Sequence, residues 1–184
     1  MDPVSSIAEV LPAAVCVRLC DQLSRAVSAD AVLMHIEAAR EAVLGRGLLT
    51  INLNATAADD PIDEVQLQRL WSSNPASYPV AGRKRKTLTP WTRQLLLRGE
   101  LFIGEGDAAL AEVFDDHALI AALGMRAIVN VPLLDEGRCF ATFNVLGTRP
   151  HWRPQEVALL RLLALLATPW VLRARRDAGL PRVG

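Results

Sequence analysis

Aromatic and basic side chains suited to holding an organic molecule gather between residues 71 and 91. Trp71 and Tyr78 precede the basic run Arg83-Lys84-Arg85-Lys86, and Trp91 follows it. Aromatic rings wall many ligand pockets, and Arg83 or a neighbouring lysine would hold a carboxylate or phosphate group. The alternative is that both tryptophans belong to the core and that the basic run is a solvated loop.

The segment Phe114-Asp115-Asp116-His117 is a second candidate. A histidine beside two carboxylates can be oriented as a general base or a pH-sensitive group. His117, Asp116 and Tyr78 are therefore the candidate catalytic residues, and Phe114, Asp116 and His117 are candidate ligand-binding residues. The alternative is that the carboxylates cap a short helix.

Polar side chains on alternate positions of three predicted strands form a third group: Thr50, Asn52, Asn130, Thr142 and Asn144. Asparagines that are covered without partners are costly, so this set implies water, a polar lid or a ligand. Asn130, Thr142 and Asn144 are candidate ligand-binding residues. The alternative is a structural hydrogen-bond ladder across the sheet.

Other kinds of site are not favoured. No set of His, Cys and carboxylate residues has metal-ligand spacing, and we expect neither a metal nor a cofactor. Twenty basic residues balance twenty acidic ones, which argues against a broad nucleic-acid surface. The three cysteines, with no secretory signal, predict packed, reduced thiols in a cytoplasmic protein: Cys16, Cys20 and Cys139.

Apolar spacing predicts helices at both ends of the chain. The first two cover residues 11–26 and about 28–44, where Gly45 ends the second. The last runs from 155 to about 173. Its apolar window, 157–172, contains Arg161 and Pro169 and is shorter than a membrane span of roughly 20 residues, so it predicts a core-facing helix and no membrane contact.

Between these helices, alternation with a period of two predicts strands at 49–53 and 64–72, and places Trp71 on the same face as Arg69. Residues 73–90 are predicted to form a long loop, which in a compact domain is often functional. Further elements follow: a short helix at 90–98, a strand at 101–103, a short helix at 115–123, and strands at 127–134 and 138–146 joined by a glycine turn at 135–137.

Helices at both ends of a mostly antiparallel sheet make an α+β sandwich. Residues 1–10 and 175–184 are predicted to be tails of one domain at 11–174. One face of the sheet is predicted to be apolar and covered by helices: Leu49, Ile51, Leu53, Val129, Val131 and Val145. The polar set lies on the opposite face.

This order of elements, with three local strings, resembles the GAF domain, a relative of PAS sensors. The strings are Gly124-Met125-Arg126-Ala127-Ile128-Val129-Asn130-Val131-Pro132-Leu133, then Gly137-Arg138, and Ala141-Thr142-Phe143-Asn144-Val145-Leu146. The resemblance spans about 11–173. It implies a sheet of about five strands in the order 2-1-5-4-3, with the terminal helices on one face, often as a dimer bundle, and a ligand pocket on the other.

By this resemblance the chain is a sensory or regulatory protein that binds a small polar or anionic organic metabolite. It would be a homodimer through its terminal helices, with output on a protein partner. An enzyme using the same pocket and a dimerising interaction module remain alternatives.

Three specialised roles within the GAF family are disfavoured. The family's methionine sulfoxide reductase needs pocket thiols, whereas Ala118-Leu119-Ile120 follows His117 here. No cysteine in the pocket segments favours bilin attachment. The Asn-Lys-Phe-Asp-Glu motif of cyclic-nucleotide binders is absent.

Overall fold

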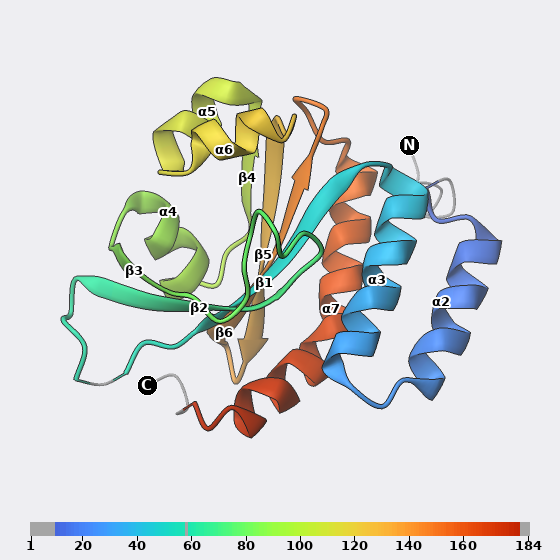
Figure 1. Ribbon diagram of the computed structural model, residues 1–184, viewed down its shortest axis with the longest axis horizontal. Helices are drawn as coiled ribbons and strands as arrows, with labels where there is room; N and C mark the ends of the chain where they lie inside the picture. The colour runs from blue at the N-terminus through green and yellow to red at the C-terminus, as the bar shows by residue number, and fades with distance from the viewer. Residues whose placement is uncertain (1–9, 58, 181–184) are drawn as a thin grey trace.

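A six-stranded antiparallel sheet in the order β3-β2-β1-β6-β5-β4 runs through the middle of the molecule (Figure 1). The structure, a computed structural model, describes residues 10–57 and 59–180. The strands are β1 (Gly47–Asn54), β2 (Glu64–Ser72), β3 (Arg83–Thr87), β4 (Phe102–Glu105), β5 (Ala127–Asp135) and β6 (Arg138–Gly147). The predicted order 2-1-5-4-3 is confirmed as β2-β1-β6-β5-β4, and β3 adds a sixth strand at one edge.

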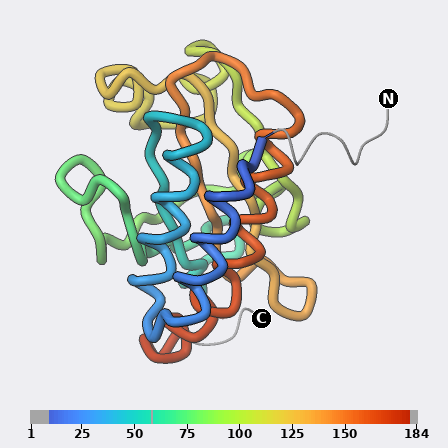
Figure 2. Tube along the Cα trace, turned by 90° about the vertical axis from the view of Figure 1, so that its right-hand side faces the viewer, coloured from blue at the N-terminus to red at the C-terminus, as the bar shows by residue number. Residues whose placement is uncertain are grey.

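Three long helices form the layer on one face of the sheet: α2 (Ala13–Arg25), α3 (Ala29–Leu44) and α7 (Pro154–Asp177). α3 and α7 pack beside each other on the sheet, and α2 packs on α3 (Figures 1 and 2). The Ser28 hydroxyl accepts a hydrogen bond from the Ala31 amide, and Gly45 ends α3 with φ 75°. These are the start and stop that the sequence predicts.

Helix α7 is long and apolar enough to cross a membrane by length and composition, the one such helix among the described residues. One side of it is buried on the sheet, including Leu159, Leu160 and Leu163. That packing is the pattern of a core helix. The helix also extends through Asp177, into the segment predicted as a C-terminal tail; residues 1–9 and 181–184 of the predicted tails lie outside the described residues.

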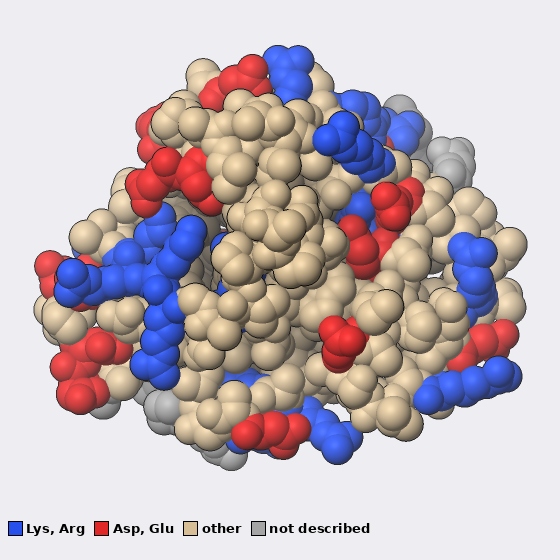
Figure 3. Space-filling view, in the orientation of Figure 1, with Lys and Arg blue, Asp and Glu red and all other residues tan. Residues whose placement is uncertain are grey.

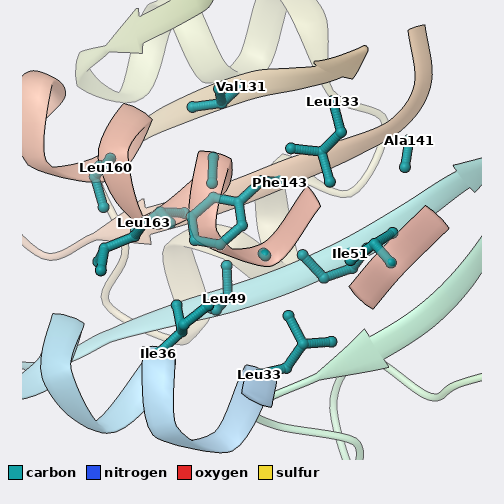
Figure 4. Close-up of a cluster of buried hydrophobic side chains, with 14 of the residues drawn as sticks. Leu33, Ile36, Leu49, Ile51, Val131, Leu133, Ala141, Phe143, Leu160 and Leu163 are labelled. Carbon is teal, nitrogen blue, oxygen red and sulfur yellow. The ribbon is translucent and has the colours of Figure 1, made fainter. Parts of the chain in front are cut away.

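The main core fills the space between the sheet and this helix layer. All six apolar strand residues predicted for this face are buried there, against α3 and α7 side chains such as Leu33, Ile36, Leu160 and Leu163 (Figure 4). Full burial of one such side chain contributes roughly 1.5–3 kcal/mol to folding. β5 and β6 are joined by Glu136 and Gly137 with φ of 50° and 79°, the left-handed pair of a tight hairpin.

The opposite face carries shorter helices and a loop. They are α4 (Pro90–Thr92), the π-helical turn η1 (Arg93–Leu97), α5 (Gly106–Val113) and α6 (His117–Ala122). α4 and η1 together form the predicted 90–98 helix, which the Thr89 hydroxyl caps. α5 was not predicted. These elements bury two small apolar clusters, one around Ile120 and Ile128 and one around Leu95 and Leu96.

Residues 83–87 correct the prediction of one long loop over 73–90, because they form the edge strand β3. Every residue of this strand is charged or polar, so apolar periodicity carries no signal for it. Charged edge strands are a common protection against pairing between molecules. The irregular loop is thereby reduced to residues 73–82.

Candidate ligand-binding site

A cavity of about 240 Å³ opens on the sheet face away from α3 and α7, between the two small clusters. Its walls are mainly apolar and aromatic: Leu48, Leu67, Trp91, Phe114, Ile120, Ile128 and Leu146. This volume lies below the roughly 300–1,000 Å³ of drug-sized ligand pockets, so it suits a compact metabolite. Basic side chains gather over the β3 edge beside it (Figure 3).

The floor of the cavity is a polar network on the central strands. The Trp91 indole N–H donates to Asn130 Oδ1 at 3.1 Å, and Asn130 Nδ2 donates to Asn144 Oδ1 at 2.7 Å. Asn144 Nδ2 lies 3.4 Å from Thr50 Oγ1 and 3.1 Å from Thr142 Oγ1. The structural ladder and the cavity floor are therefore the same set of residues.

The residues of this network differ in whether they line the cavity. Asn130, Asn144 and Thr50 line the cavity, whereas Thr142 is buried beneath it and positions Asn144. The sequence implied water, a polar lid or a ligand over the asparagines, and the Trp91 indole is such a polar lid over Asn130. Because each amide keeps unused donor or acceptor capacity, direct ligand contact by Asn130 and Asn144 stays a prediction.

Tyr78 lies on the 73–82 loop, which positions its side chain at the cavity. The loop turns on Asn74, whose Oδ1 accepts from the Ser77 amide and whose carbonyl accepts from the Tyr78 amide. The Tyr78 side chain is 5% exposed, and its buried hydroxyl has the Asp116 carboxylate beside it as an acceptor, outside the geometry of a well-formed hydrogen bond. Burial, and then the nearby Asp116 carboxylate, raise the pKa of Tyr78, so its hydroxyl remains a proton donor at neutral pH.

Arg69 is a lining residue that the sequence analysis did not select. Its guanidinium lies 5.0 Å from the Tyr78 ring centroid, and Nη1 donates to the Pro79 carbonyl at 3.3 Å. The Nε–H is buried and unpaired among the described residues. Strand alternation places Arg69 opposite Asn52, on the cavity face, which is the sequence signal that could have found it.

The basic run divides between the two faces of β3. Lys84 pairs with Leu67 and Lys86 with Val65, so both lysines lie on the cavity face and line it. Arg83 pairs with Gln68, is exposed and does not line the cavity. Of the residues in this run predicted to hold an anion, the neighbouring lysines Lys84 and Lys86 line the cavity and Arg83 does not. That an anion binds there stays a prediction. A period of two explains the difference once the run is known to be a strand.

Trp71 does not line the cavity, contrary to the sequence prediction. The β1–β2 register shifts between Ile51 and Asn52, so Ile51 faces Trp71 while Asn52 faces Arg69. The extra residue on β2 is a bulge, which reverses the face of every side chain beyond it. Trp71 therefore packs against the helix-side core, and its indole N–H donates to Asp30 at 2.9 Å.

The Phe114–His117 segment also divides. Phe114 lines the cavity and meets the Trp91 ring edge-on at 5.3 Å. Asp115 pairs with Lys86, which lowers the pKa of Asp115 and ties this segment to β3. Asp116 occupies the N-cap position of α6 without a side-chain capping bond, and it lines the cavity. The capping alternative is therefore wrong for Asp116.

His117 lies outside the cavity. Its ring is exposed, and Nδ1 is 3.1 Å from the Phe114 carbonyl oxygen. The structure therefore brings Tyr78 and Asp116 together but separates His117 from them. A base acting on a molecule in the cavity must reach it within hydrogen-bond distance, and His117 does not line that space.

The thiols lie away from the cavity. Cys139 is buried in the cluster around Leu95, its thiol donates to the Ala141 carbonyl, and burial raises its pKa to about 12. Cys16 and Cys20 are on α2, in the other layer. Within the described residues, no group of three or more His, Cys, Asp or Glu side chains could hold a metal ion.

The fold recurs in solved structures of other proteins. A GAF domain of a phosphoenolpyruvate-protein phosphotransferase from Coxiella burnetii matches 97% of this chain and 100% of its own, with 14% identity and TM-score 0.64. A domain of a two-component sensor histidine kinase from Sinorhizobium meliloti matches 80% and 94%, with 20% identity and TM-score 0.57.

The chromophore-binding domain of a bacteriophytochrome from R. palustris matches 89% of this chain and 61% of its own, with 14% identity and TM-score 0.57. At such identities these likenesses show the fold alone. No curated protein sequence matches the chain. The sequence profile of the GAF domain, however, matches residues 12–168. This chain belongs to the GAF domain family.

Proposed function

We propose that this protein binds a small polar or anionic organic metabolite in the cavity above Asn130 and Asn144. The cavity itself, which is walled by aromatic rings, floored by the hydrogen-bonded Asn130 and Asn144 amides and lined by the cation Arg69, is the observation that carries the proposal. The buried Arg69 Nε–H has no partner among the described residues. Such a group costs about 1–3 kcal/mol, and a bound molecule that accepts its hydrogen bond recovers that loss. The aromatic walls and the ordered amide floor supply contact area and orientation.

Binding, not catalysis, is the function that these residues support best. The raised pKa of Tyr78 keeps its phenol protonated, which makes it a hydrogen-bond donor and leaves no phenolate to act as a base at neutral pH. His117 is outside the cavity, and the thiols lie elsewhere. Among the described residues, Asp116 is the one carboxylate that lines the space, and a single carboxylate near a tyrosine positions a ligand as readily as it moves a proton.

The role that we assign is sensory or regulatory, in the cytoplasm, with output through a partner protein or a second copy. The names of the similar structures, a sensor histidine kinase and a bacteriophytochrome among them, support this class of role. We further propose a homodimer through the helix layer. Large apolar side chains are exposed on that layer: Val17, Met34, Leu162, Leu165 and Leu166.

A metabolite screen by thermal shift tests the binding function. A compound that binds only the folded state raises the melting temperature by mass action. Leu119→Trp adds bulk at a partly exposed position that lines the cavity, and should abolish the shift. Leu97→Trp, at an exposed apolar position outside the cavity lining, is the matched control and should keep it. A shift that survives in both variants places the binding elsewhere and contradicts the proposal.

A further inference from the structure

Two cavity residues have buried hydrogen-bond donors that are not well satisfied by the described residues: the Arg69 Nε–H has no partner, and the Tyr78 hydroxyl has the Asp116 carboxylate beside it without a well-formed bond. Both side chains line the cavity, and the guanidinium lies against the Tyr78 ring. From this pair we infer that the ligand carries one carboxylate group, held by Arg69 and Tyr78, on a compact apolar body. This inference rests on the proposed function and names the class of ligand.

These two donors indicate that the ligand must supply hydrogen-bond acceptors. An arginine guanidinium can only donate hydrogen bonds. The Tyr78 hydroxyl also serves as a donor, because burial, and then the adjacent Asp116 charge, raise its pKa and keep it protonated. Donors on two side chains that line the same cavity can be satisfied by a group with two acceptor oxygens, and the planar fork of arginine matches a carboxylate in particular.

The charges around the cavity favour a single negative charge. The ionisable side chains that line it, besides Tyr78, are Arg69, Lys84, Lys86 and Asp116. Lys86 is already paired with Asp115, and the Arg69 charge is in part balanced by Asp116. One anionic group fits this balance. A dianion such as a phosphate ester would bring its second charge toward the Asp116 carboxylate, which disfavours it.

The apolar walls of the cavity indicate the shape and polarity of the rest of the ligand. Trp91 and Phe114 meet edge to face at 5.3 Å, and aliphatic side chains of Leu48, Ile128 and Leu146 complete that side. Apolar walls and a volume of about 240 Å³ suit one small ring or a short branched chain. An aromatic monocarboxylate therefore combines the two halves of the site.

The test compares matched pairs of compounds by isothermal titration: benzoate with benzamide, and phenylacetate with phenylacetamide. Phenyl phosphate is the dianionic comparison. Each amide keeps the ring and loses the charge. We expect the carboxylates to bind at least tenfold more tightly than their amides and than phenyl phosphate. Arg69→Gln should remove that preference, and Tyr78→Phe should weaken carboxylate binding severalfold while amide binding stays unchanged.

Arg83→Gln is the control, because it removes the same kind of charge from the residue next to Lys84 but on the other face of β3. It should leave carboxylate binding unchanged. If Arg69→Gln does not fold, Arg69→Lys keeps the positive charge and removes the fork, and should still lose most of the preference. Equal binding of acids and amides, or an Arg69→Gln variant that keeps the preference, overturns the inference.

The outcomes separate this inference from the proposed function. Neutral or cationic compounds that bind, and that Leu119→Trp excludes, would uphold a binding cavity while overturning the carboxylate assignment. If no monocarboxylate binds, the assignment is wrong whatever else the cavity takes. If neither this panel nor the metabolite screen yields a compound, both proposals fail.

Discussion

At the scale of single residues, the face that a side chain occupies decides its role. Trp71 and Trp91 are equally plausible pocket residues in the sequence. In the structure the Trp91 indole donates to a buried asparagine under the cavity, while the Trp71 indole donates to Asp30 on the helix layer. The two tryptophans therefore act on different groups, Asn130 and Asp30.

This difference predicts unequal costs for one substitution. Trp91→Phe leaves the Oδ1 atom of Asn130, a residue 1% exposed, without its indole donor, and should lower the free energy of unfolding by about 1–3 kcal/mol beyond the loss of ring area. Trp71→Phe removes a bond that solvent replaces and should lack that extra cost. Urea unfolding of both variants measures it. A larger loss for Trp71→Phe would contradict these assignments.

At the scale of elements, apolar periodicity predicts the helices and strands that bury an apolar face, and it misses those that do not. β1, β5, β6 and the long helices each bury one apolar face, so their positions and the two faces of the sheet follow from the sequence. β3 contains no apolar residue, and its alternation has no hydrophobic marker. The bulge that moves Trp71 depends on pairing with β1, a tertiary event that no local pattern records.

The start of α7 gives a second prediction. The Glu156 side chain is 0% exposed and accepts hydrogen bonds from Arg149 at 2.5 Å, from the Arg153 side chain at 2.9 Å and from the Arg153 amide. Burial alone would raise the pKa of Glu156, but these bonds outweigh it and lower the pKa. Glu156→Gln should therefore destabilise the fold by about 2 kcal/mol at pH 7, as measured by urea unfolding.

The lowered pKa of Glu156 also predicts how its contribution to stability changes with pH. A carboxyl group with a lowered folded pKa stabilises the fold above its unfolded pKa of about 4.3, and the contribution disappears as pH falls through the folded value. The stability difference between the natural protein and Glu156→Gln should thus be constant near neutrality and shrink below about pH 4.3. A difference that grows on acidification would show that the bonds to the arginines do not set this pKa.

At the scale of the whole molecule, the proposed ligand and the proposed second copy would use opposite faces of the sheet. The long helices cover one side of the sheet (Figures 1 and 2), and the cavity residues lie on the other, so a molecule bound in the cavity would leave the helix layer free for a second copy. Such an arrangement permits a sensor to exchange ligand while it remains assembled.

The proposed homodimer can be tested through α7. Leu165 is 67% exposed on this helix, and Leu165→Glu places a charge in the expected interface, where its burial is unfavourable. Light scattering after size exclusion should show a dimer for the natural protein and a shift to monomer for Leu165→Glu. Ile62→Glu, at a 96% exposed loop position, is the control and should remain dimeric. A monomeric natural protein would refute the dimer without affecting the cavity.

The indole resonances of the tryptophans test the central claim, a ligand held against the face of the sheet opposite the long helices. The chain has four tryptophans, of which Trp91 lines the cavity and Trp71 lies on the helix side. In a ¹⁵N-resolved NMR titration with a compound from the thermal-shift screen, the Trp91 indole N–H resonance should move in proportion to binding while that of Trp71 stays in place. Movement of Trp71 with a stationary Trp91 would contradict the account.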